Sequence, residues 1–117
     1  DGRETPGAAL AAAAALGVSG PVLNSESFGG YLVFKGVPTF IDGRIEMYGD
    51  EFLRRYLAIE SGAGPALGEA LEQYGITWTL LHPEAGAVAA LDHRPGWRRA
   101  YSGPDAIIHI RVAAPAR

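Results

Sequence analysis

The stretch that decides the fold is NSESFGGYLVFKGVPTFIDGR, residues 24–44, together with the short apolar run Pro21–Leu23 that precedes it. A second apolar run, Pro38–Ile41, lies near its end. The first run is followed by Asn24 and the second by Asp42, so each ends on a small polar residue. Short apolar runs without alternation are typical of buried parallel strands, whose carboxyl ends line the crevice of an open α/β sheet. The sequence therefore predicts two adjacent parallel strands with polar ends.

Helices and strands are expected to alternate on both sides of this stretch. A helix should begin at Thr5-Pro6, continue through Ala8–Leu16 and end at Gly17, because threonine caps, proline fits the first turn and glycine adopts a left-handed conformation. The other expected elements are a short helix after Gly30, helices from Asp50 and Pro65, a strand over Ile76–Leu81, a helix over Glu84–Leu91, and a hairpin of Trp97–Tyr101 and Ala106–Val112. This order predicts a three-layer α/β/α sandwich with a mostly parallel sheet of about five strands and a C-terminal antiparallel hairpin.

Periodicity also predicts which residues are buried. Trp78 and Trp97 are expected to pack in the core or at its edge. His109 alternates with Ile108 and Ile110, which predicts that it lies on the solvent side of an edge strand. Two helices carry apolar stripes, one made by Phe52, Leu53, Tyr56 and Leu57 and the other by Leu67, Ala70, Leu71 and Tyr74.

Size and charge indicate a single domain, residues 1–117, with an ordinary core. Ten basic and thirteen acidic residues are scattered along the chain and give a net charge of −3. Because there is no basic stripe, nucleic acid is not expected as a partner. The absence of cysteine excludes disulfides, thiolate metal sites and a cysteine nucleophile. The chain begins with Asp1 rather than Met and has no apolar run of about 20 residues, which favours a domain excised from a larger protein.

The candidate ligand-binding residues follow or flank the two apolar runs. The paired glycines are placed to offer backbone N–H groups at a helix start, which is a natural anion site. The arginine adds positive charge, and the two tyrosines add flat faces with hydroxyl groups, so the set suits a phosphate or a polar sugar. The residues are Asn24, Gly29, Gly30, Tyr31, Asp42, Arg44 and Tyr48.

A purely structural interpretation of the same residues stands beside this one. Asn24 would cap the turn that follows it, and Asp42 would form an Asx-turn with Gly43 and pair with Arg44. Neither the dinucleotide-binding glycine pattern nor the P-loop is present. We expect Asp42 to hold the local turn and Arg44 to contact a ligand or partner.

No catalytic group or cofactor is predicted. The three histidines, His82, His93 and His109, lie on different elements without metal-ligand spacing. Ser25 and Ser27 lack the glycine-flanked elbow of a nucleophilic serine. The prediction is therefore no catalytic residue, no metal and no cofactor.

The chain nevertheless resembles a known kind of domain over roughly residues 5 to 112. The segments that carry the resemblance are Asn24, FGGYL at 28–32, FIDGR at 40–44 and YGD at 48–50, with YGITW at 74–78 and PGW at 95–97 as weaker parts. They are similar to the soluble C-terminal domains of bacterial and archaeal polytopic membrane proteins that resemble dolichyl-phosphate-mannose-type (GT-C) glycosyltransferases and oligosaccharyltransferases.

The resemblance implies a role that the residues alone do not. In such proteins the acids for glycosyl transfer lie in the membrane part, so this chain would be a non-catalytic accessory domain on the extracytoplasmic face. Its partners would be the transmembrane portion of its own parent chain and a sugar or lipid-phosphate. The alternative is a stand-alone small α/β enzyme or nucleotide- or phosphate-binding module that uses Asn24, Asp42 and Arg44.

Overall fold

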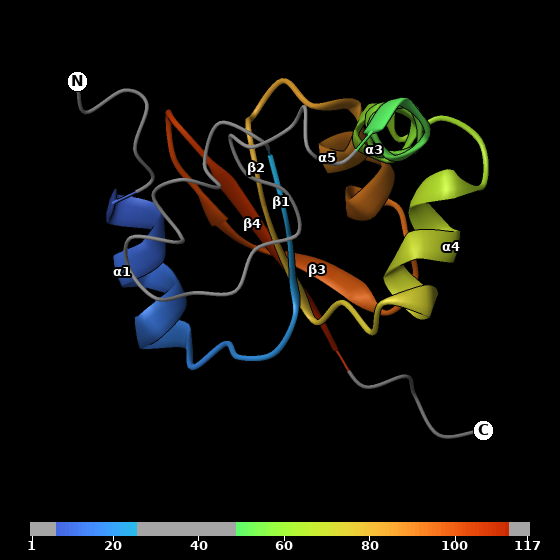
Figure 1. Cartoon of the computed structure of the whole chain (residues 1–117). Coiled ribbons are helices and arrows are strands. Elements are labelled where there is room, and N and C mark those ends of the chain that lie inside the picture. The colour runs from blue at the N-terminus through green and yellow to red at the C-terminus, as the bar shows by residue number, and fades with distance from the viewer. Residues whose placement is uncertain (1–6, 26–48, 113–117) are drawn as a thin grey trace, which may run out of the picture.

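The computed structural model describes residues 7–25 and 49–112, which form a mixed α/β arrangement around one open sheet (Figure 1). The coarse prediction of an α/β fold is confirmed. The helices are α1 (Gly7–Leu16), α3 (Gly49–Ser61), α4 (Ala66–Gln73) and α5 (Gly86–Asp92). The strands are β1 (Val22–Asn24), β2 (Trp78–Leu81), β3 (Trp97–Ser102) and β4 (Ile107–Arg111).

The sheet has the strand order β1-β2-β4-β3. β1 runs parallel to β2, with Val22 opposite Trp78, whereas β4 runs antiparallel to both β2 and β3. The parallel first strand and the C-terminal hairpin are therefore confirmed. The described part of the sheet is mixed, with one parallel and two antiparallel pairings. The predicted strand Pro38–Ile41 lies outside the described residues.

Helices lie on both faces of this sheet, α1 on one and α3, α4 and α5 on the other (Figure 1). Successive residues of a strand point to opposite faces. In β1, Val22 belongs to the core cluster shared with α1, while Leu23 belongs to the cluster shared with α3, α4 and α5. Leu80 and Leu81 of β2 divide in the same way. Each face therefore has its own apolar core.

The first helix behaves as its sequence predicts. Ala9 and Ala13, four residues apart on one face, are both buried. Such small side chains let α1 pack closely on the sheet. Gly17 follows the helix with φ +74°, a conformation that glycine adopts without steric cost.

The apolar stripes of α3 and α4 are correct only in part. Tyr56 and Ile59 of α3 are buried, but Leu57 is 55% exposed, so its assignment to the core was wrong. Successive helical residues are turned by about 100°, and this rotation carries Leu57 away from the face used by Tyr56. On α4 the stripe ends at Leu71, because Tyr74 is 39% exposed and lies against the guanidinium of Arg55.

The prediction for His109 was wrong, because this side chain is completely buried. β4 lies between β2 and β3 and is not an edge strand. The alternation of His109 with isoleucines implied one solvated face, but both faces of the sheet are covered by helices. The burial expected for Trp78 and Trp97 is confirmed.

Candidate functional site

The carboxyl ends of β1 and β2 are joined by the hydroxyl group of Ser25. Its Oγ donates a hydrogen bond to Oε2 of Glu60 on α3 at 2.7 Å and accepts one from the backbone N–H of His82 at 3.0 Å. Its own backbone N–H donates to the Leu80 carbonyl oxygen at 3.0 Å, which continues the parallel pairing. Ser25 thus ties two strands and one helix together, and it is fully buried.

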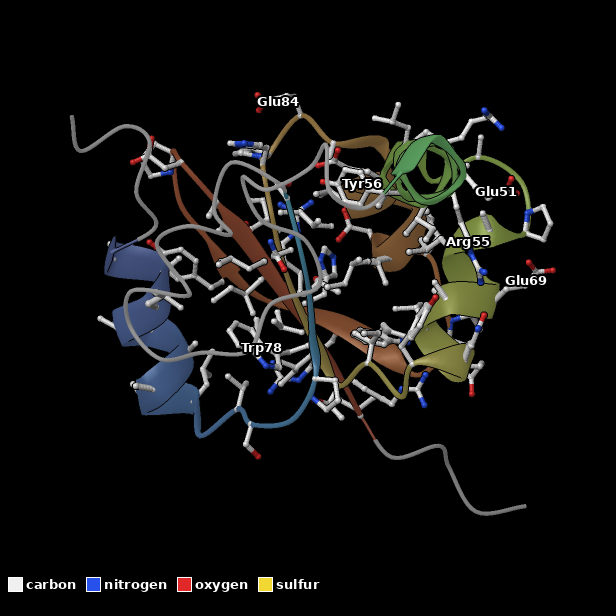
Figure 2. All side chains as sticks on the ribbon, viewed as in Figure 1. Glu51, Arg55, Tyr56, Glu69, Trp78 and Glu84 are labelled. Carbon is white, nitrogen blue, oxygen red and sulfur yellow. The ribbon has the colours of Figure 1, made fainter. Side chains whose placement is uncertain are left out.

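A hollow of about 320 Å³ lies beside this hydrogen-bonded junction. It is bounded by the C-terminal half of α3 and by the connection from β2 to α5, where Glu84 is seen (Figure 2). Its walls carry two carboxylates, one imidazole, one hydroxyl group and small apolar surfaces. The lining residues are Leu57, Glu60, Ser61, His82, Glu84, Ala85 and Gly86.

Two glycines allow the walls of the hollow to approach so closely. A Cβ atom on Gly86, the first residue of α5, would collide with the carbonyl oxygen of Ser61 at the end of α3. A Cβ atom on Gly62 would lie 2.7 Å from the carbonyl oxygen of Gly86, and Gly62 has φ +74°. The backbone contact between α3 and α5 therefore requires glycine on both sides.

The chemistry of the hollow favours neutral polar ligands over anions. The carboxylates of Glu60 and Glu84 accept hydrogen bonds from hydroxyl groups and repel a phosphate or a second carboxylate. The exposed side chain of Leu57 offers an apolar contact beside them. A ligand with several hydroxyl groups and apolar C–H faces fits this combination.

A second polar cluster connects α5 to the sheet. His109 Nε2 lies 2.7 Å from Oδ1 of Asp92, and Arg99 donates to both oxygens of the same carboxylate, at 3.0 and 2.6 Å. The hydrogen bond from Arg99, supported by His109, lowers the pKa of Asp92 to about 2. Burial lowers the pKa of His109 below its ordinary value, against the opposing influence of Asp92.

This second cluster is built for stability and not for reaction. The ring of His109 is completely buried, and its Nδ1 has no hydrogen-bond partner in the part of the chain that the structure describes. The neutral ring carries its hydrogen on Nε2, where the Asp92 carboxylate accepts it. Because the ring is inaccessible, the cluster serves to fix the end of α5 against β3 and β4.

Of the predicted ligand-binding residues, Asn24 alone lies in the described part of the chain. It is fully buried, and its side-chain amide donates to the Ser25 carbonyl oxygen at 2.9 Å. This contact agrees with the interpretation in which Asn24 supports the local backbone. The other predicted site residues lie outside the described residues: Gly29, Gly30, Tyr31, Asp42, Arg44 and Tyr48.

Sequence reasoning missed four residues of this site. Ser25 and His82 each follow a parallel strand directly, so the rule that singled out Asn24 applies to them as well. Glu60 and Glu84 had no such signal. Glu60 is 35 residues from Ser25 in the chain, and only the packing of α3 on the sheet brings them together.

We expect Ser25→Ala to lower the free energy of unfolding by about 1–3 kcal/mol, because it removes the Ser25 acceptor of the part-buried His82 N–H. Ser61→Ala is the matched control, since its exposed hydroxyl makes only local bonds to Ala58 and Ala63. That variant should lose less than about 1 kcal/mol. Urea denaturation measures both values, and equal losses would contradict a joining role for Ser25.

Comparison with known proteins finds no matching family model, no matching curated protein and no matching solved structure. Within residues 7–25 and 49–112, no helix combines the length and apolar character needed to cross a membrane. Histidine and acidic side chains of these same residues form no group of three arranged to hold a metal ion.

Proposed function

We propose that this chain is a non-catalytic accessory domain of a membrane glycosyltransferase-like protein, placed on the extracytoplasmic face. In this role it contacts its own transmembrane portion and holds the sugar part of a lipid-linked substrate. The observation that carries the sugar assignment is the hollow at the ends of β1 and β2, with the carboxylates of Glu60 and Glu84 beside Leu57. The resemblance of residues 24–50 to domains of such proteins supports the membrane context.

The composition of the hollow favours the sugar over the phosphate of such a substrate. Sugar hydroxyl groups donate to carboxylates, and the C–H face of a pyranose packs on an apolar side chain. A phosphate at the same place would meet two negative charges. We therefore assign the sugar, and not the phosphate, to this hollow.

The accessory role is supported by how the polar groups at the strand ends are used. The Ser25 hydroxyl is buried and hydrogen-bonded to Glu60, so it is not placed to attack a substrate. Glu60 in turn holds α3 to the sheet. These residues position the walls of the hollow, which is what a binding domain requires.

The alternative function is a stand-alone small α/β enzyme or a nucleotide- or phosphate-binding module that uses Asn24, Asp42 and Arg44. The position of Asn24 at the carboxyl end of a parallel strand favours it, because α/β folds bind ligands there. The full-length gene separates the two proposals. Several hydrophobic spans encoded upstream of Asp1 support the accessory domain, and a complete short reading frame contradicts it.

We also propose an architecture that extends beyond the described residues. We propose that Pro38–Ile41 adds a further parallel strand beside β1, within a three-layer α/β/α sandwich. All three residues of β1 are buried, although β1 pairs with one strand only among the described residues. The proposed strand would lie along the edge of β1 that faces away from β2.

Titration with mannose, glucose and N-acetylglucosamine, followed by two-dimensional NMR, tests the sugar site. We expect shifts at residues of the hollow, and about tenfold weaker binding for Glu84→Gln, because a charge-assisted hydrogen bond of about 1.5–3 kcal/mol is weakened. Glu60→Gln should act similarly while keeping an acceptor for Ser25. Glu69→Gln on α4, which is exposed and does not line the hollow (Figure 2), is the control.

Two outcomes count against the sugar site. One is the absence of any saccharide-dependent shift at the hollow. The other is an equal loss of binding in the Glu69 and Glu84 variants, which would indicate a general charge effect.

A further inference from the structure

A second groove, of about 430 Å³, opens at the other end of β2. Thr77, which precedes β2, lines this groove, whereas His82, which follows β2, lines the hollow described above. Thr77 and His82 are five positions apart along the chain, which corresponds to roughly 16 Å in a strand, so the groove and the hollow are distinct sites. The residues that line the groove are Glu72, Thr77, Arg94, Pro95, Gly96, Trp97, Arg111 and Val112.

One of the two arginines of this groove is held firmly in place. The Arg111 guanidinium donates to Oε2 of Glu72 at 2.7 Å and lies over the ring of Trp97, 5.3 Å from its centroid. Its charge is balanced by Glu72, while the stacking fixes its orientation. The contacts with Glu72 and Trp97 therefore orient the Arg111 guanidinium at the wall of the groove.

The other arginine of the groove, Arg94, has no acidic partner among the described residues. Arg94 is half-buried in the turn between α5 and β3, and it forms no ion pair with any acidic group of the described chain. Its guanidinium lies against α4 at Gly68, where a Cβ atom would approach one terminal nitrogen to 2.9 Å. Glycine thus makes room for a charge that the described residues leave uncompensated.

The side chains that line the groove therefore carry a net positive charge, although the net charge of the whole chain is −3. Its charged side chains are two arginines and one glutamate. A half-buried guanidinium gains most from an oxyanion, which accepts two parallel N–H···O bonds from its planar fork. Phosphate offers three or four such oxygens with more charge than one carboxylate.

We propose that this groove binds a phosphate group, with Arg94 as the main ligand and Arg111 as the second. The inference deepens the proposed function, on which it rests for the nature of the phosphate compound. The phosphate belongs either to a small soluble phosphate ester or to the headgroup of a lipid. Both present the same oxygens to the two guanidinium groups.

The test uses the whole chain with glycerol 3-phosphate as the soluble probe, followed by two-dimensional NMR. We expect shifts at residues lining the groove and at least tenfold weaker binding for Arg94→Gln. Arg98→Gln is the matched control, because Arg98 is exposed on β3, carries the same charge and does not line the groove. It should change the affinity by less than twofold.

A second arm distinguishes the two sources of phosphate. Vesicles of phosphatidylcholine with one quarter phosphatidic acid are compared with pure phosphatidylcholine in a sedimentation assay. Arg94-dependent binding to the acidic vesicles, tighter than to glycerol 3-phosphate, identifies a lipid headgroup. Binding to the soluble ester alone identifies a small phosphate compound.

Several outcomes would overturn the inference. They are no shift at the groove with either probe, or equal losses in the Arg94 and Arg98 variants. If Arg94→Gln does not fold, Arg94→Lys is tested in its place. Lysine keeps the positive charge but lacks the two parallel N–H donors of the guanidinium, so phosphate binding should weaken several-fold. Unchanged binding in this variant counts against the site. If phosphate binding is absent while saccharide binding persists, only the phosphate site in the groove is rejected. If saccharide binding is absent while phosphate binding persists, only the sugar site in the hollow is rejected.

Discussion

Gly62→Ala is expected to lower the free energy of unfolding by about 2–5 kcal/mol, which is a large share of the roughly 5–15 kcal/mol typical of a folded protein. Two costs add. A left-handed backbone costs a residue with a Cβ atom about 1–2 kcal/mol, and Gly62 has φ +74°. The new methyl group would also lie 2.7 Å from the Gly86 carbonyl oxygen and 2.9 Å from the Ala87 Cα, and such overpacking costs about 1–3 kcal/mol more.

Gly64→Ala is the control that separates these two costs. Gly64 has φ +68°, close to that of Gly62, but nothing lies within 4 Å of the position of its Cβ atom. It should therefore lose only the backbone part, about 1–2 kcal/mol. Urea denaturation of the two variants gives the difference, which measures the close contact between α3 and α5. Equal losses would show that this contact is not tight.

The second large effect concerns pH and the buried ring of His109. Burial lowers the pKa of His109 in the folded chain below its ordinary value of 6.5. The unfolded chain therefore binds a proton more readily, so stability is complete above about pH 6.5 and falls as the pH drops below it. We expect stability to fall with pH below about 6.5, with a slope of at most about 1.4 kcal/mol per pH unit for this single proton.

Denaturation at pH 7.5, 6.5, 5.5 and 5.0 checks this slope. In His109→Gln the slope over this range should be lost, since no titrating ring remains at that position. His93→Gln, at the end of α5, removes an exposed histidine and should leave the slope unchanged. A slope that persists in the His109 variant, or disappears in the His93 variant, would place the pH sensitivity elsewhere.

Asp92 adds a separate loss at lower pH. Its pKa is lowered from 3.8 to about 2 in the folded chain, first by the hydrogen bond from Arg99. The stabilisation is therefore complete above about pH 4 and disappears as the pH falls toward 2. The Asp92 loss lies mainly below about pH 4, under the range of pH 7.5 to 5.0 that is used to test His109.

Much of the local structure was accessible from the sequence. The helix that ends at Gly17 and the helix from Pro65 were predicted, and Gly17 has a positive φ. The strand over Ile76–Leu81 was also clear. These features depend on neighbours in the chain, through capping, periodicity and the freedom of glycine, so local sequence suffices to predict them.

The candidate site was predicted less well. The rule for the ends of parallel strands led to Asn24, and the structure places a polar junction and a hollow at that end of the sheet. The same rule applies to Ser25 and His82, which directly follow β1 and β2, but it was not used for them. Glu60 and Glu84 were not foreseen, since α3 and the connection after β2 meet only when the chain is folded.

The sequence by itself determined the class of fold and the C-terminal hairpin, because short-range periodicity and turn residues specify them. Only the tertiary structure decided the position of β4 inside the sheet and hence the burial of His109. Among residues 7–25 and 49–112 it also decided which charges have an oppositely charged partner, as at Arg111, and which have none, as at Arg94. The physical reason is that burial and electrostatic pairing depend on residues far apart in the chain, which periodicity does not encode.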